Sequence, residues 1–190
     1  EMLFPELSAL AETIVVPIDS IGVLRVSGHD AEEFLQAQLT SDISNILPNS
    51  SAIAGYCNPK GRLLAVFTIF REKGDYLLIS ESEALLKVAK TLSMYILRLK
   101  VNLVIDRSLI PVGFIGGELD QIMRKLREAD VGKGDTINFI KEPYVSFVWP
   151  NYPGLLALLP EFCVKAVWPI VAEHAKIGHP RHWDLFEIRA

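Results

Sequence analysis

Cysteine is scarce in this chain of 190 residues, which has only Cys57 and Cys163 and no CxxC spacing. A disulfide framework, a structural zinc site and a cysteine-bound iron–sulfur cluster are therefore not expected, and a reducing compartment is the default. Histidines are also few, and although His179 and His182 are close in sequence, Pro180 prevents both from projecting from one helical face. We therefore predict no metal site.

An excess of basic residues is also absent. The 23 acidic residues outnumber the 19 basic ones, so the chain has no general electrostatic footprint for nucleic acid. The longest uncharged stretch, residues 143–160, contains four prolines and favours short strands and turns over a membrane helix. The first residues show no signal-peptide pattern. We expect a cytoplasmic protein, with the mitochondrial matrix as the alternative.

Catalytic and nucleotide-binding motifs are missing. Ser27 and Asp30 flank a glycine and a histidine, but a catalytic triad is assembled in space from separate elements rather than from neighbours in sequence. The glycine-rich turns at 116–117 and 132–134 lack the spacing of a P-loop or a dinucleotide fingerprint. A structural role is favoured for Cys57. We therefore predict no catalytic residue.

What the chain does have is material for an ordered core, because 50% of its residues are apolar and 22% are charged. βαβ-like groups interrupted by antiparallel hairpins favour an α+β fold over a doubly wound parallel sheet. We predict two similar α/β halves, residues 1–106 and 107–190. The expected strands cover 14–17, 23–26, 52–57, 62–71, 75–80, 101–105, 110–115, 136–140, 144–149 and 154–159.

Two expected helices begin with the spacing of a capping box, Asp30 with Glu33 and Ser80 with Glu83. Apolar residues at the helical period extend the second of these helices as far as Leu99. Further helices are expected through 122–126 and over 161–175.

One segment near the middle of the chain carries the clearest turn signal. Asn58, Pro59 and Gly61 occupy the positions at which a type I turn prefers these residues. The apolar, β-branched run that follows is typical of a buried strand. Lys60 and Arg62 could meet an anionic ligand here, although a plain hairpin explains the same residues.

Four segments, in their order and spacing, resemble the YgfZ family of folate-binding proteins, which are relatives of the glycine-cleavage T-protein. The resemblance covers residues 24 to 190. It implies an aminomethyltransferase-like folate-binding fold with ferredoxin-like α/β halves. The segments are 34–42 (FLQAQLTSD), 56–70 (YCNPKGRLLAVFTIF), 94–101 (MYILRLKV) and 183–190 (WDLFEIRA).

The resemblance implies tetrahydrofolate as the ligand. Folate has a flat pterin and a carboxylate-bearing tail, so an apolar slot with a cation at its mouth would match it. Tyr56, Tyr95 and Trp183 could supply aromatic walls. The residues predicted to face folate belong to the resembling motifs and are Asn58, Lys60, Arg62, Tyr95, Arg98 and Arg189. For Arg98, a position at the end of a helix is a sufficient alternative explanation.

The chain departs from the catalytic relatives at two places. Ala65 and Val66 stand where T-proteins carry a pair of aspartates, and neither can act in acid–base chemistry. Arg189 stands where those enzymes have a glutamate. The resemblance thus implies a non-catalytic folate binder that supports iron–sulfur cluster enzymes and tRNA modification. The charge balance and the lack of a membrane helix predict no direct nucleic-acid or membrane contact. The alternatives are a folate-dependent aminomethyltransferase and a folate-free protein-interaction module; the oligomeric state is left open.

The Lys-Gly-Cys-Tyr loop that is most diagnostic of the family is absent from the sequence. An apolar cluster lies in the last eight residues, and uncovered clusters of this kind favour association. We therefore expect the native chain to continue past Ala190 into that loop and a barrel-type C-terminal domain.

Overall fold

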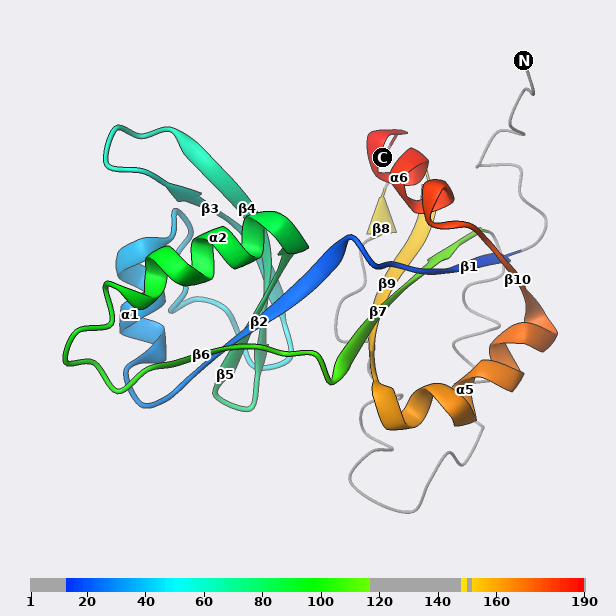
Figure 1. Cartoon of the computed structure of the whole chain (residues 1–190), viewed down its shortest axis with the longest axis horizontal. Coiled ribbons are helices and arrows are strands. Elements are labelled where there is room, and N and C mark those ends of the chain that lie inside the picture. Colours follow the sequence, from blue (N-terminus) through cyan, green and yellow to red (C-terminus); the bar gives the residue numbers. More distant parts are fainter. Residues whose placement is uncertain (1–12, 117–147, 150–151, 190) are drawn as a thin grey trace. The chain divides into compact units, whose positions relative to one another are not determined.

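The computed structural model describes residues 13–116, 148–149 and 152–189. These residues form two compact units (Figure 1), which we call the central unit, Asp19–Arg107, and the terminal unit, made of residues up to Ile18 and from Ser108 onward. Each unit combines a largely antiparallel sheet with helices, so the predicted α+β class is confirmed. The expected strand at 136–140, most of that at 144–149 and the helix through 122–126 lie outside the described residues.

The sheet of the central unit has five antiparallel strands in the order β3-β4-β5-β2-β6. The meander predicted from the turn signals is present, because β3 pairs with β4 and β4 pairs with β5. The strands are β2 (Ile21–Ser27), β3 (Ser51–Cys57), β4 (Leu63–Glu72), β5 (Asp75–Glu81) and β6 (Asn102–Ile105).

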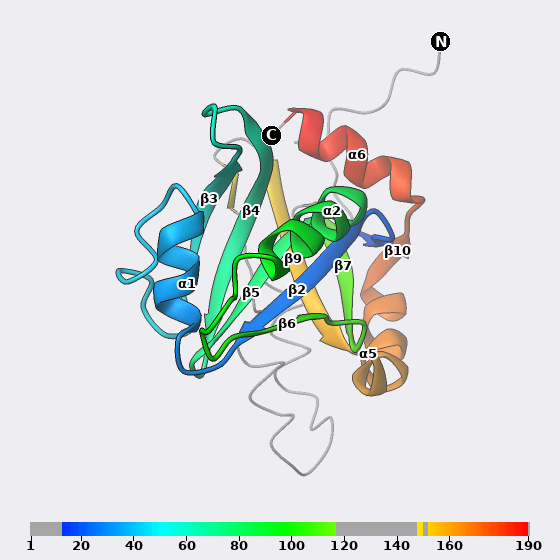
Figure 2. The same cartoon turned by 60° about the vertical axis from the view of Figure 1, so that its left-hand side comes forward.

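Two helices, α1 (Ala31–Gln38) and α2 (Ser82–Ser93), pack on one face of this sheet (Figure 2). Phe34 and Leu35 of α1 and Leu85 of α2 join the same buried cluster as Phe67 and Leu78 of the strands. Burial of these large apolar side chains, each worth about 1.5–3 kcal/mol, is the main source of the unit's stability.

Among its described residues, the terminal unit has a second sheet, in the order β10-β1-β7-β9-β8, in which only the pair β1–β10 is parallel. Val112 and Phe114 of β7 pack in a core with Val171 of α5, whereas Gly113 between them lies against the Trp183 ring of α6. The two helices therefore cover opposite faces of the sheet. The elements are β1 (Thr13–Pro17), β7 (Leu109–Ile115), β8 (Val148–Trp149), β9 (Tyr152–Pro160), α5 (Glu161–His174), β10 (Ala175–Ile177) and α6 (Pro180–Arg189).

Two features of the terminal unit differ from the sequence prediction. Residues 14–17 were expected in the half 1–106, but β1 pairs with β7 and β10 of the other sheet. No helix was predicted at α6, which begins at Pro180, a residue favoured in the first turn of a helix. His179 caps it, since its Nδ1 accepts the Arg181 N–H at 3.2 Å. Helix capping is therefore a structural explanation for His179.

The second helix is shorter than its apolar pattern indicated. It begins at Ser82 rather than Ser80, whose hydroxyl instead donates to the Val66 carbonyl at 2.8 Å, and it ends at Ser93. Ile96 and Leu99 still pack against the central core, but from a turn that follows the helix. Arg98 therefore does not end a helix, and the helix dipole does not account for it.

The side chain of Asp30 was expected to cap α1, but it makes no capping hydrogen bond. Its Oδ2 accepts the backbone N–H of Lys100 at 2.7 Å, and its own N–H donates to the Lys100 carbonyl at 3.3 Å. His29 Nδ1 lies 2.7 Å from Asp30 Oδ1. Asp30 thus fastens the segment after α2 to the start of α1.

This fastening is expected to depend on pH. The hydrogen bonds from His29 and from the Lys100 amide lower the pKa of Asp30. The stability that ionised Asp30 gives to the fold is therefore present above about pH 4, and it is lost as pH falls through the lower folded-state pKa. Asp30 raises the pKa of His29. The stability from protonated His29 is therefore present below about pH 6.5, and it is lost as pH rises through the raised folded-state pKa of His29. Hydrogen-exchange protection of the Lys100 amide should therefore fall in acid. Asp30→Asn keeps an acceptor without a charge and should remove this pH dependence; equal acid sensitivity in both proteins would contradict the assignment.

Candidate functional site

The turn between β3 and β4 is organised by the side chain of Asn58. Its Oδ1 accepts the backbone N–H groups of Lys60 and Arg62, both at 3.0 Å, and its carbonyl accepts the Gly61 N–H at 2.9 Å. Gly61 has a φ of 78°, which few other residues adopt without strain. The turn therefore holds the exposed Lys60 and Arg62 at the tip of the hairpin.

A β-bulge beside the turn sets the face of the hairpin to which Leu64 belongs. Tyr56 pairs with Ala65 and Cys57 with Leu63, which leaves Leu64 as the extra residue. Leu64 lines a pocket together with Tyr56, whereas Leu63 lies over Gly55, because a Cβ built there would be 2.7 Å from Leu63 Cδ1. Consecutive strand residues point to opposite faces, so the two leucines lie on opposite faces. The bulge places Leu64 on the same face as Ala65, its other neighbour.

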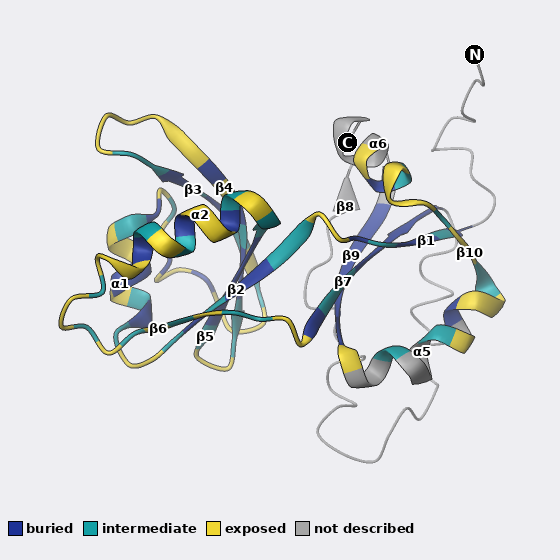
Figure 3. Ribbon diagram, in the orientation of Figure 1, coloured by how far each residue is buried: buried dark blue, intermediate teal, exposed yellow. Residues whose placement is uncertain are grey.

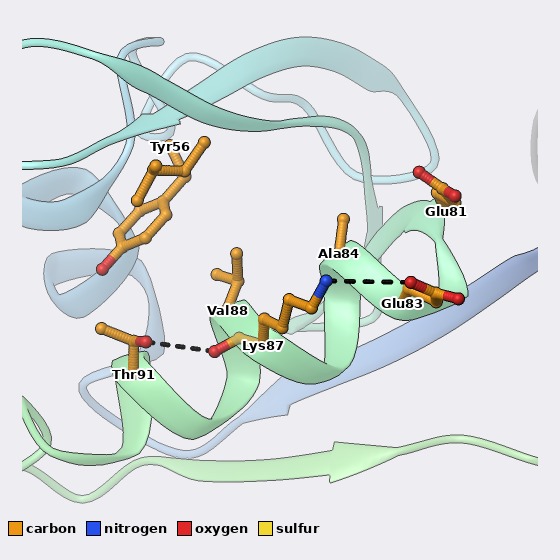
Figure 4. Close-up of a pocket in the computed structure, with 8 residues that line it drawn as sticks. Tyr56, Glu81, Glu83, Ala84, Lys87, Val88 and Thr91 are labelled. Atoms are coloured by element: carbon orange, nitrogen blue, oxygen red, sulfur yellow. Dashed lines mark hydrogen bonds and ion pairs between the residues drawn. The ribbon is translucent and has the colours of Figure 1, made fainter.

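One face of the hairpin and helix α2 enclose a pocket of about 250 Å³ (Figure 4). Tyr56 lies at one end of it, and Glu81 and Glu83 lie at the other. Glu83 forms an ion pair of 3.7 Å with Lys87. The lining is apolar in the middle and acidic at one end, and consists of Tyr56, Leu64, Glu81, Glu83, Ala84, Lys87, Val88 and Thr91.

Tyr56 is the most buried polar side chain of this pocket, with 5% of its surface exposed. Burial, with a smaller effect from the neighbouring Tyr95, raises the pKa of Tyr56 above its ordinary value. The phenol therefore stays protonated at neutral pH and presents a donor rather than a charge.

The opposite face of the hairpin is an open apolar surface, which we call the hairpin patch. It consists of Ile53, Leu63 and Val66, each at least 50% exposed, and Figure 3 shows the solvent-exposed end of the hairpin in yellow. Lys60 and Arg62 lie in the turn, after Ile53 and before Leu63 in the sequence. The patch therefore combines apolar area with two cations.

The outer edge of β3 is covered by the segment that follows α1. The Gly55 N–H donates to Thr40 Oγ1 at 2.7 Å, and the Thr40 N–H donates to the Gly55 carbonyl at 3.0 Å. Ser41 Oγ donates to the Ile53 carbonyl. These bonds occupy backbone groups that an edge strand would otherwise offer to another chain, and they fix the strand that carries the patch.

The two positions expected to replace the catalytic aspartates lie on different faces of β4. Ala65 is 7% exposed and belongs to the central core, whereas Val66 is 50% exposed in the hairpin patch. Neither side chain can exchange a proton. These two positions therefore supply apolar surface and no acid–base group.

The structure brings only some of the predicted site residues together. Asn58, Lys60 and Arg62 share the hairpin turn, while Tyr95 and Arg98 are exposed in the segment after α2. Arg189 ends α6 in the terminal unit, and its side chain lies outside the described residues. Of the five whose side chains are described, none lines the pocket.

The pocket residues on α2 were missed by the sequence analysis. Ala84, Val88 and Thr91 follow the helical period beside the core stripe of Leu85 and Leu92, so one helical face continues into the pocket. That broadened stripe was the available signal. Within the described ranges, no group of three histidine, cysteine or acidic residues could hold a metal ion, and no helix is long and apolar enough to cross a membrane.

Comparison with known proteins shows which proteins this chain is similar to. No family model matches it. It is 25% identical over 189 residues to the tRNA-modifying protein YgfZ of Klebsiella pneumoniae, an alignment that covers 98% of this chain and 57% of that protein. It is 26% identical over 172 residues to the protein of the same name from Vibrio vulnificus, covering 85% and 52%. The predicted resemblance to YgfZ proteins is confirmed.

A solved structure shows a similar fold. The glycine cleavage system aminomethyltransferase T from Bartonella henselae matches with a TM-score of 0.69 at 14% identity, over 91% of this chain and 49% of that one. The aminomethyltransferase-like fold is therefore confirmed. The chain spans a little over half the length of the curated relatives that it matches.

Proposed function

We propose that this protein binds tetrahydrofolate at the hairpin and acts without catalysing aminomethyl transfer. The observation that carries the proposal is the hairpin patch, where apolar Val66 stands at a position expected for a catalytic aspartate and Lys60 and Arg62 are exposed in the adjoining turn. A flat pterin can lie on the apolar side chains, while the two cations meet the carboxylates of the glutamate tail. Tyr95, Arg98 and Arg189 remain predicted further contacts.

The cellular role that we propose is support of iron–sulfur cluster enzymes, including those that modify tRNA, in the cytoplasm. Its basis is the similarity to proteins named as tRNA-modifying and the family resemblance. Deleting the full-length gene should lower both iron–sulfur enzyme activity and modified tRNA under oxidative stress. Normal levels of both would exclude this role while leaving folate binding intact.

Folate binding is tested by titrating the chain with 5-formyltetrahydrofolate, a stable reduced folate, in a calorimeter. Replacing Lys60 and Arg62 together by alanine should weaken binding by about 10-fold or more, because charge-assisted contacts to the tail are lost. Lys87→Ala is the matched control, since Lys87 lies on the pocket side of the hairpin. Unchanged affinity in the double variant, or an equal loss in Lys87→Ala, would remove the proposed site.

The fold similarity to an aminomethyltransferase favours a second candidate, folate-dependent aminomethyl transfer. The two functions are separated by assaying glycine cleavage with the full-length protein and its carrier protein. We expect no turnover, because Ala65 and Val66 supply no group that can orient or deprotonate an amine. Turnover above that of a boiled control would favour the enzyme.

A further inference from the structure

Leu97 has a conformation and an exposure that the fold does not explain. The Leu99 N–H donates to the Ile96 carbonyl at 2.8 Å, so Leu97 is the first central residue of a tight turn. It has a φ of 47°, which favours glycine at this position, and 86% of its surface is exposed. The leucine therefore strains the turn and gains nothing from burial.

The turn is nonetheless held firmly. Ile96 and Leu99 on either side of its tip pack against the central core, and the next residue, Lys100, is bound through its backbone by Asp30. Leu97 thus projects from a fixed base and cannot fold back onto its own unit. A side chain that is held out in this way loses little entropy when it binds.

The neighbours of Leu97 complete a surface that we call the knob. Met94 is 64% exposed, and Arg98 and Lys100 are exposed cations on the same segment. Within the described part of the chain, no carboxylate pairs with the Arg98 guanidinium. The knob is therefore an apolar tip with positive charge beside it.

The pocket described above has the opposite character. Leu64, Ala84 and Val88 give it apolar walls (Figure 4). Glu81 and Glu83 lie at one end, and because only one lysine, Lys87, pairs with Glu83 there, that end keeps a net negative charge. The knob follows the last residue of α2, whereas the acidic end lies at its first turn, about 18 Å away along the helix. Since the helix fixes both, Arg98 and Lys100 do not reach the acidic end of the pocket in their own chain.

We propose that two copies of this chain associate, with Leu97 of each entering the pocket of the other. Arg98 and Lys100 then lie against Glu81 and Glu83 of the second copy. A two-fold axis makes both contacts at once and closes the pair, with the two α2 helices antiparallel. Few side chains take part, so the association is weak, concentration-dependent and sensitive to salt.

Sedimentation equilibrium over a range of protein concentrations tests this proposal. The unmodified chain should show a monomer–dimer equilibrium that shifts toward monomer in high salt. Leu97→Gly should weaken dimerisation at least 10-fold and leave the thermal stability equal or higher, because glycine suits the turn. Leu47→Gly, at another leucine that is 70% exposed, is the matched control and should dimerise normally.

A mixing experiment identifies the two surfaces. Glu83→Lys should also be monomeric, because the pocket then repels Arg98. Mixed with Leu97→Gly, it should form a weak heterodimer, since one intact knob meets one intact pocket. A chain that is monomeric at all concentrations, dimers that survive Leu97→Gly, or no heterodimer in the mixture would each overturn the proposal.

Discussion

Replacing Arg25 with methionine is expected to lower the unfolding free energy of the central unit by about 3 kcal/mol at neutral pH. Arg25 lies on β2 among three carboxylates from different elements. Its Nη1 is 2.8 Å from Glu72 and 3.2 Å from Asp75, and its Nε is 2.9 Å from Asp106. Methionine would keep much of the packing but leave three acidic groups close together without this cation.

The charge on Arg25 is well supported. Burial by itself lowers the pKa of the guanidinium, but hydrogen bonds to Glu72 and Asp106 outweigh that effect and hold it above its ordinary value. The side chain is only 27% exposed, so water cannot easily replace the lost partner. The cost therefore comes mainly from the mutual repulsion of carboxylates that have lost their shared cation, rather than from the loss of an attraction.

The pH dependence of the Arg25→Met variant distinguishes this cause from lost packing. Without the guanidinium, the carboxylates repel one another when all are ionised, so the variant should lose stability as pH rises and recover part of it near pH 5. Hydrogen exchange of buried β5 amides is the suitable measurement, because all three tryptophans lie outside the central unit.

Lys87→Met is the matched control for the loss of an ion pair. Lys87 and Glu83 are four residues apart on α2, and their side chains are about 80% exposed. Solvent screens such pairs, so the change should cost no more than about 0.5 kcal/mol. Similar losses in the two variants, or an Arg25→Met penalty that is independent of pH, would contradict the account of the buried cluster.

The parts of the fold that were predictable from sequence are those governed by local signals. The turn at Asn58 and the one at Lys73-Gly74 separate the three strands of the meander, and both residue sets favour turns whatever surrounds them. The core face of α2 was also predictable, because Leu85 and Leu92 follow the helical period.

The errors arose where distant parts of the chain decide the structure. Residues after α2 keep a helical spacing of apolar side chains, yet Ile96 and Leu99 reach the core from a turn, which periodicity cannot distinguish from a longer helix. Asp30 has the spacing of a cap, but the Lys100 amide, seventy positions away, is its partner. Likewise, the pairing of β1 with β7 follows from no local pattern.

In the candidate site, too, features set by the local sequence were predictable and features set by strand pairing were not. The hairpin turn and its cations were found from sequence, whereas the pocket required the bulge that turns Leu64 toward α2. A one-residue shift in strand pairing is not visible in a run of apolar residues. The positive φ of Leu97 could not be predicted either. Leucine is a good helix former, so its presence at that position indicates a helix rather than a turn that suits glycine.

Gly28→Ala is expected to be more damaging than an ordinary glycine substitution, with a loss of about 4 kcal/mol. Gly28 has a φ of 114°, and a Cβ built on it would lie 2.1 Å from the Lys100 carbonyl oxygen and 3.2 Å from Val101 Cα. Both contacts are with backbone, so no side chain can simply rotate away. The segment after α2 would have to move, which would also break the bonds from Asp30 to Lys100.

A second glycine separates the two causes. Gly74 has nearly the same φ, 111°, but a Cβ built there meets nothing within 4 Å. Gly74→Ala should therefore cost only the backbone strain, about 1–2 kcal/mol, and the remainder of the Gly28→Ala loss reports the close approach of Lys100. Hydrogen exchange of β5 amides measures both in the same unit, and equal losses would mean that the contact with Lys100 contributes nothing. Because the same segment carries the knob, Gly28→Ala should also weaken self-association at protein concentrations where the folded variant still predominates, whereas Gly74→Ala should not.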